Sequence, residues 1–277
     1  MAMNTSDGDR YGFRFVRTEL RGDGVLWATL DRPERRNAIS PEMHDELTPL
    51  FRRIAEDREV RVAVLTGAGD KAFCVGADFG GMQDNLEGNA YEDGFPELMI
   101  GSAALVRAQL AVPQPIIAAI NGDAIGLGAT MALFCDIPLM AAEARLADPH
   151  VKAGLVAGDG GAILWPLLMG LNRGKEFLLT GDMMGAEEAH RLGLVNHVHP
   201  RSELAAAAGE LATRLAQGPQ VAIQFNKRLA NAELVDRVNR VIDASLAMEA
   251  ITFATADHRE AVRSFVEKRE PRFGGGS

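Results

Sequence analysis

Apolar and polar residues are spaced as in strands near the start of the chain and as in a helix soon afterwards. Two segments rich in β-branched and aromatic residues, 13–19 and 25–31, flank Asp23-Gly24, and this pattern predicts a β-hairpin. Ser40 before Pro41 predicts a helix start, with Ser as N-cap and Pro in the first turn. Apolar residues at 43, 47, 50 and 54 then recur with the helical period.

Short apolar segments and helical segments alternate through the middle of the chain. We predict strands at 60–66, 115–120 and 137–141, and helices at 100–110 and 128–134. This alternation is typical of an α/β fold with a mostly parallel sheet.

The pattern becomes almost entirely helical beyond about residue 160. Helices are predicted at 162–169, 173–179, 186–192, 204–216, 221–230 and 257–268, with one last short strand at 195–199. We therefore divide the chain into an α/β core over 11–200 and a helical C-terminal region over 201–273. Residues 1–10 and the Gly-Gly-Gly-Ser end at 274–277 are expected to be disordered or added sequence.

Composition narrows the classes of function. The 277 residues carry a formal net charge of −9, which argues against a nucleic-acid partner, whose phosphates need a basic surface. The two cysteines, Cys74 and Cys135, exclude a disulfide scaffold, and neither has metal-site spacing, so no metal is expected. No apolar run reaches the roughly 20 residues that span a bilayer, and the polar N-terminus lacks the pattern of a secretory signal. We expect a cytoplasmic protein with no membrane partner.

Three glycine-rich turns follow predicted strands, at 67–69, 121–128 and 158–161. None contains a phosphate-binding Walker sequence, and Met131 stands where a dinucleotide-binding motif has its third glycine. Two of the turns lead into predicted helices. A helix N-terminus presents unpaired N–H groups and suits a negatively charged group.

Ordered motifs occur from about residue 12 to residue 273. They are LDRP at 30–33, NA at 37–38, LTGAG at 65–69, AFCVGAD at 72–78, AAING at 118–122, GLG at 126–128, CDI at 135–137, LTG at 179–181, GLV at 193–195 and FVEKR at 265–269. In these motifs the chain resembles the crotonase (enoyl-CoA hydratase/isomerase) superfamily. The resemblance implies a spiral of β-β-α units, a helical trimerisation region, and a homotrimer or a dimer of trimers.

The resemblance also implies the chemistry. Members bind acyl-CoA thioesters and stabilise an enolate, with coenzyme A carried by the substrate and no separate cofactor. The two main-chain N–H groups of the oxyanion hole correspond to Ala77 and Leu127. Preorganised donors of this kind can each lower a barrier by about 3–4 kcal/mol.

The chain departs from the family's hydratases at both catalytic glutamates. Thr130 stands in place of one, and Asp148-Pro149-His150 in place of the other. We therefore expect His150 to act as acid and base, with Asp159 as the carboxylate that orients its ring. The segment around His150 and Asp159 also resembles 6-oxocamphor hydrolase, a superfamily branch that cleaves β-diketones by a retro-Claisen route.

The resemblance assigns further residues to substrate. Around the acyl group these are Asp78, Phe79, Gly80, Gly126 and Thr130, and near coenzyme A they are Arg35, Lys71, Phe73 and Lys268. Glu249 falls in a predicted helical context and is expected on a solvated face.

Three functions stay open at this stage. The first is an acyl-CoA hydratase or isomerase, and the second is a C–C bond hydrolase acting on a β-dicarbonyl. The third is a non-catalytic acyl-CoA-binding or scaffold protein, which the loss of both glutamates would explain.

Overall fold

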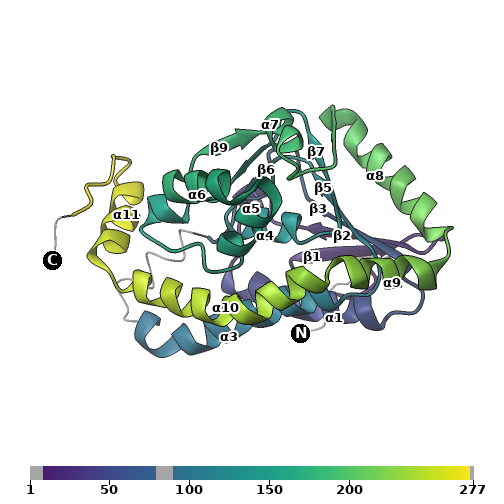
Figure 1. Ribbon diagram of the computed structural model, residues 1–277, viewed down its shortest axis with the longest axis horizontal. Coiled ribbons are helices and arrows are strands. Elements are labelled where there is room, and N and C mark those ends of the chain that lie inside the picture. Colours follow the sequence, from purple (N-terminus) through teal and green to yellow (C-terminus); the bar gives the residue numbers. More distant parts are fainter. Residues whose placement is uncertain (1–8, 79–89, 275–277) are drawn as a thin grey trace.

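A six-stranded sheet forms the centre of the computed structural model, which describes residues 9–78 and 90–274 (Figure 1). In sheet order its strands are β1 (Val16–Leu20), β2 (Val25–Leu30), β3 (Val62–Gly67), β5 (Ile116–Ile120), β7 (Ile137–Ala141) and β10 (His197–His199). The predicted hairpin is confirmed, because β1 and β2 pair antiparallel, and the other neighbours pair parallel. All five residues of β5 are buried, as expected of a parallel strand covered on both faces.

A smaller sheet of four strands was not predicted. It contains β4 (Ala72–Cys74), β6 (Asp123–Ile125), β8 (Arg145–Ala147) and β9 (Met183–Gly185), in that order. Each of these strands has three residues, which is too short to show an alternating pattern in the sequence. Because β4, β6 and β8 directly follow β3, β5 and β7 along the chain, the fold repeats a strand pair that contributes one strand to each sheet.

Helices connect and cover the two sheets. In the core they are α1 (Pro41–Glu56), α3 (Ala90–Ala111), α4 (Leu127–Leu133), α5 (Gly161–Met169), α6 (Leu171–Thr180) and α7 (Ala186–Arg191), with 3-10 turns η1 (Pro33–Arg35) and η2 (His150–Ala153). The predicted start of α1 is confirmed, because the Ser40 side chain accepts a hydrogen bond of 3.3 Å from the N–H of Met43. The apolar positions that predicted α1 are all buried.

The helices after residue 200 enclose the core. They are α8 (Arg201–Ala216), α9 (Gln220–Ala230), α10 (Ala232–Phe253) and α11 (Ala256–Val266). Helix α8 contacts β2, β3, β5, β7 and β10, while α10 runs beside α3 (Figure 1). Helix α11 contacts η2, so the C-terminal helices reach the segment that carries His150. The limits of α10, a helix of 22 residues, were not predicted.

The α/β fold class is confirmed. Among the described residues, no helix is both long and apolar enough to cross a membrane.

Candidate active site

A cavity of about 380 Å³ lies between α1, α3, the start of α4, η2 and α10. Its wall includes Ala77, Leu127, His150 and Asp159, the four residues predicted to be catalytic, together with Glu249. Most of the rest of the wall is apolar.

Two glycine-containing turns meet at one side of this cavity. Gly76 has a φ of +81°, and a Cβ at this position would lie 2.9 Å from the carbonyl oxygen of Ile125 and 3.6 Å from the amide nitrogen of Leu127. A Cβ on Gly128 would lie 2.2 Å from the carbonyl oxygen of Cys74. Glycine is therefore required at both positions, because β4 and the start of α4 approach each other at main-chain distance.

The two amides predicted for the oxyanion hole belong to these turns. Ala77 follows Gly76, and Leu127 is the first residue of α4 after the N-cap Gly126. The first N–H groups of a helix have no acceptor within the helix, so the Leu127 amide is available to a ligand. Both residues line the cavity.

His150 lies against the Leu127 turn. A Cβ on Gly126 would be 3.5 Å from Cε1 of the imidazole, and Gly126 itself has a φ of +54°. The side chain of His150 is 14% exposed, and its Nδ1 is hydrogen-bonded to the Asp148 carboxylate, which is buried. The second ring nitrogen, Nε2, is the one that lies near Asp159 and Glu249.

The orienting carboxylate is Asp148, and the prediction that Asp159 fills this role is wrong. Asp159 Oδ2 lies 3.7 Å from His150 Nε2, on the opposite side of the ring from Asp148. Its other oxygen, Oδ1, accepts a hydrogen bond of 3.2 Å from the Thr130 hydroxyl. The turn at Pro149 brings the Asp148 carboxylate to Nδ1 of His150. The spacing of residues in the sequence does not predict this contact.

Glu249 belongs to this cluster, contrary to the expectation of a solvated glutamate. Its side chain is buried, Oε1 lies 3.9 Å from His150 Nε2, and Oε2 has no hydrogen-bond partner among the described residues. The buried residues Val238, Ile242, Leu246 and Phe253 share its helix, and position 249 falls on the same helical face. That spacing was the sequence signal for its burial.

Charge and burial together shift the pKa values of the cluster. Burial disfavours the imidazolium of His150, but the nearby Asp148 and Asp159 outweigh it and raise the pKa of His150 to about 10. Burial and the neighbouring Asp159 raise the pKa of Glu249 to about 8, and burial also raises the pKa of Asp159. At neutral pH His150 and most Glu249 carboxyl groups therefore hold a proton.

Of the five residues predicted around the acyl group, some line the cavity, one does not, and two are not described. Asp78 and Gly126 line the cavity, whereas Thr130 stands behind Asp159 and is not part of the wall, which corrects its predicted contact with substrate. Asp78 forms an ion pair of 3.1 Å with Arg32. Phe79 and Gly80 lie outside the described residues.

The four residues predicted near coenzyme A are not among the residues that line the cavity. Arg35, Lys71 and Lys268 are exposed, as a contact with phosphate would require. The side chain of Phe73 is fully buried in the core, so only its main chain could contact a ligand.

The cluster also has the makeup of a metal site. Asp148, His150 and Asp159 offer ligand atoms within 4.8 Å of one another, although no metal was predicted. Asp148 and Nδ1 of His150, however, are already hydrogen-bonded to each other, so a metal ion at either atom would have to break this bond. The raised pKa values of His150 and Glu249 suit the cluster to exchanging protons near neutral pH.

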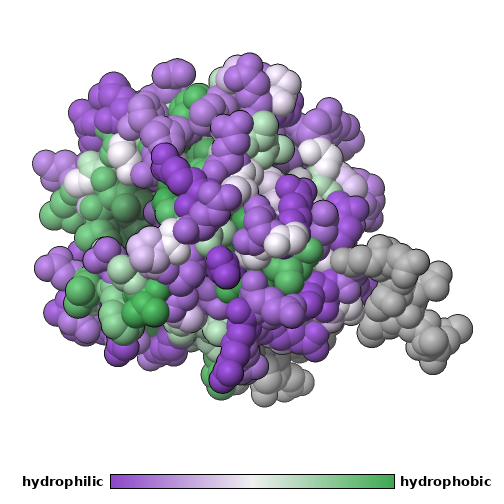
Figure 2. Space-filling model, turned by 90° about the vertical axis from the view of Figure 1, so that its right-hand side faces the viewer, coloured by the Kyte–Doolittle hydropathy of each residue, from purple (hydrophilic) through white to green (hydrophobic). Residues whose placement is uncertain are grey.

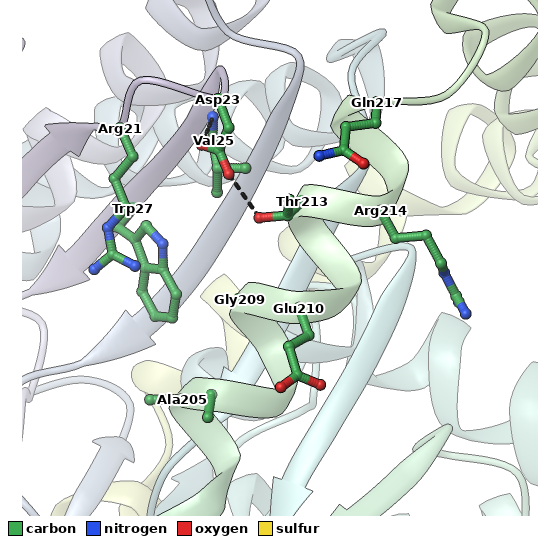
Figure 3. Close-up of a pocket in the computed structure, with 11 residues that line it drawn as sticks. Arg21, Asp23, Val25, Trp27, Ala205, Gly209, Glu210, Thr213, Arg214 and Gln217 are labelled. Atoms are coloured by element: carbon green, nitrogen blue, oxygen red, sulfur yellow. Dashed lines mark hydrogen bonds between the residues drawn. The ribbon is translucent and has the colours of Figure 1, made fainter.

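A second hollow, of about 570 Å³, lies between the β1–β2 turn and α8 (Figure 3). There the Arg21 guanidinium lies 4.4 Å from the centre of the Trp27 ring, and Thr213 donates a hydrogen bond of 2.6 Å to Asp23. Among the described residues, this hollow shares none with the cavity at His150, and its lining includes no histidine.

The family model for enoyl-CoA hydratase/isomerase matches residues 21–276. The chain belongs to this family. It is 34% identical to 1,2-epoxyphenylacetyl-CoA isomerase of Escherichia coli over 91% of this chain and 95% of that protein.

Two solved structures are similar to this chain over most of its length. An enoyl-CoA hydratase/isomerase from Mycobacterium paratuberculosis has a TM-score of 0.85 and 36% identity, covering 90% of this chain and 98% of that one. A β-diketone hydrolase from the cyanobacterium Anabaena has a TM-score of 0.78 and 31% identity, covering 87% and 94%.

Proposed function

We propose that this member of the enoyl-CoA hydratase/isomerase family is an enzyme that polarises a carbonyl group with the amides of Ala77 and Leu127 and moves protons with His150, Asp159 and Glu249. The observation that carries the proposal is the meeting of both turns and the buried His150 cluster at one cavity. A scaffold protein would have no need of buried acids with raised pKa values, because burying such groups is costly.

For an enoyl thioester the steps are an addition and a proton transfer. The Asp159 carboxylate accepts a proton from water while the water oxygen bonds to the β-carbon. The electron pair of the double bond moves to the thioester oxygen, where the two amides stabilise the enolate. Protonated His150 or Glu249 then supplies a proton to the α-carbon.

A β-dicarbonyl substrate would use the same groups, and two observations favour this second candidate. The hydratase glutamates are replaced, and the Anabaena β-diketone hydrolase is similar over most of the chain. Water activated by Asp159 would attack one carbonyl, and the bond between the carbonyl carbon and the α-carbon would break. The products are a carboxylic acid and an enolate, which the amides hold until His150 protonates it.

The decisive experiment compares the two substrate classes with the same variants. Crotonyl-CoA and a cyclic β-diketone are assayed with wild type, His150→Ala and the exposed-surface control His197→Ala. We expect turnover of one class, a loss of about 100-fold or more in kcat for His150→Ala, and no loss for the control. Wild-type kcat in His150→Ala would refute the assignment.

Arg35, Lys71 and Lys268 are proposed to attract the phosphates of coenzyme A, each as an exposed cation. Replacing all three with Gln should raise KM for the thioester and leave kcat near wild type. The proposed chemistry requires no cofactor besides the coenzyme A that the substrate carries. We also propose that the protein is cytoplasmic.

We also propose assembly as a trimer or a dimer of trimers, as in the family resemblance. On α9, Val221, Phe225 and Leu229 are spaced four residues apart and are 66%, 61% and 75% exposed. Figure 2 views the right-hand side of Figure 1, where α9 lies, and shows apolar patches among polar surface. Light scattering after size exclusion should give a trimer or hexamer mass, and Phe225→Glu should reduce it.

A further inference from the structure

A second polar pair lies in the cavity wall, separate from the acid cluster. His44 on α1 and Ser102 on α3 both line the cavity, and His44 Nε2 lies 3.4 Å from the Ser102 hydroxyl oxygen. A Cβ on Gly101 would lie 3.2 Å from Cε1 of His44, so the glycine leaves room for the imidazole. No hydrogen bond or ion pair among the described residues joins this pair to His150, Asp159 or Glu249.

The surroundings of the pair are apolar. Met99, Ile39 and Phe253 line the same cavity, as do other apolar side chains from α1 to α10. A polar pair in such a wall is costly unless it has partners. The contact of 3.4 Å is long for a hydrogen bond, which leaves both groups with capacity for another partner.

The charges around the pair indicate the kind of partner. Burial lowers the pKa of His44, so its imidazole is neutral at neutral pH. In the described part of the cavity wall there is no Lys or Arg, while Asp45, Asp78, Asp159 and Glu249 all contribute to it. The protonated His150 in this wall already lies beside Asp148, Asp159 and Glu249. A carboxylate on the acyl group beside His44 and Ser102 would therefore meet no unpaired countercharge, whereas a neutral oxygen would meet a donor and an acceptor.

We propose that His44 and Ser102 bind an uncharged oxygen group, a ketone or a hydroxyl, on the acyl part of the substrate, distinct from the carbonyl that reacts. This inference rests on the proposed function, because it specifies the substrate for the same cavity. The pair is a specificity determinant and takes no part in the proton transfers.

Binding of unreactive ligands tests the pair without depending on turnover. Calorimetry compares hexanoyl-CoA with its analogues that carry a ketone at C4 or C5, using wild type, His44→Phe and Ser102→Ala. The matched controls are His197→Phe and Ser202→Ala, both at exposed positions outside the cavity. His44→Gln, which keeps a donor and an acceptor, shows whether hydrogen bonding rather than shape is responsible.

In wild type and both controls, we expect at least one keto analogue to bind about ten-fold more tightly than hexanoyl-CoA. His44→Phe and Ser102→Ala should reduce that ratio to less than about two, and His44→Gln should restore part of it. Equal binding of all the ligands by wild type, or an unchanged ratio in the two variants, would overturn the inference. If wild type binds no thioester, the acyl-CoA proposal fails. The same variants are then compared on cyclohexane-1,4-dione against cyclohexanone, which are both neutral and lack a β-dicarbonyl group, and equal binding again overturns the role of the pair.

Discussion

The carboxylate of Asp148 is hydrogen-bonded to Nδ1 of His150, two residues further along the chain. This contact fixes the ring so that Nε2 is the nitrogen near Asp159 and Glu249. The histidine is thus flanked by carboxylates on both sides of the ring, and this explains its raised pKa.

Asp148→Asn should lower both the activity and the pKa of His150. The amide keeps the shape of the side chain but removes a negative charge beside the imidazolium. We expect kcat to fall by about 100-fold or more, and the basic limb of the kcat profile to move to lower pH. Asp182→Asn, at an exposed position outside the cavity, is the control. A profile that matches wild type would show that Asp148 does not tune His150.

Leu127→Pro tests the amide without removing a side chain from the acid cluster. Proline is tolerated at the first position of a helix, and Leu127 is the first residue of α4. Loss of the N–H should reduce kcat by about 100-fold to 1,000-fold, with a small change in thermal stability. Leu127→Ala retains the amide and should keep most of the activity. Equal losses in both variants would mean that the side chain matters and the amide does not.

Glu249 should make the folded protein less stable as the pH rises. Its pKa is raised from 4.5 to about 8, so in that interval the folded chain holds a proton that the unfolded chain has released. The free energy of unfolding then falls with pH, and His150, raised from 6.5 to about 10, contributes with the same sign up to its own pKa.

Denaturant titrations at pH 5, 7 and 9 measure this effect. Glu249→Gln should unfold at higher denaturant than wild type, by a margin that grows from pH 5 to pH 9. Glu233→Gln, an exposed position on the same helix, should track wild type. Parallel curves for wild type and Glu249→Gln would contradict the raised pKa.

Gly161→Ala should destabilise the protein and reduce activity together. A Cβ at this position would lie 1.8 Å from Oδ2 of Asp148, so the carboxylate must move away from its place beside His150. We expect a loss of about 1–3 kcal/mol in the free energy of unfolding and a lower kcat. Gly185→Ala, where a Cβ meets nothing within 4 Å, should change neither quantity. Wild-type kcat in Gly161→Ala would show that Asp148 can shift without consequence.

Much of the fold could be predicted because its signals are local. Strands β3, β5 and β7 are continuous apolar segments, and the buried positions of α1 recur with the helical period, so each can be recognised from its own residues. The second sheet could not be predicted this way, since three-residue strands are defined by pairing with neighbours far away in the chain.

Part of the candidate site could also be predicted from the sequence, and part could not. The family motifs in the sequence were enough to place the two amide donors at Ala77 and Leu127 and to single out His150 as acid and base. The folded arrangement was needed to see that Asp148 rather than Asp159 is hydrogen-bonded to Nδ1 of His150, and that Glu249 is buried beside them. The reason is physical: a hydrogen bond or a pKa depends on distances and burial, and those are set by how separate segments pack together.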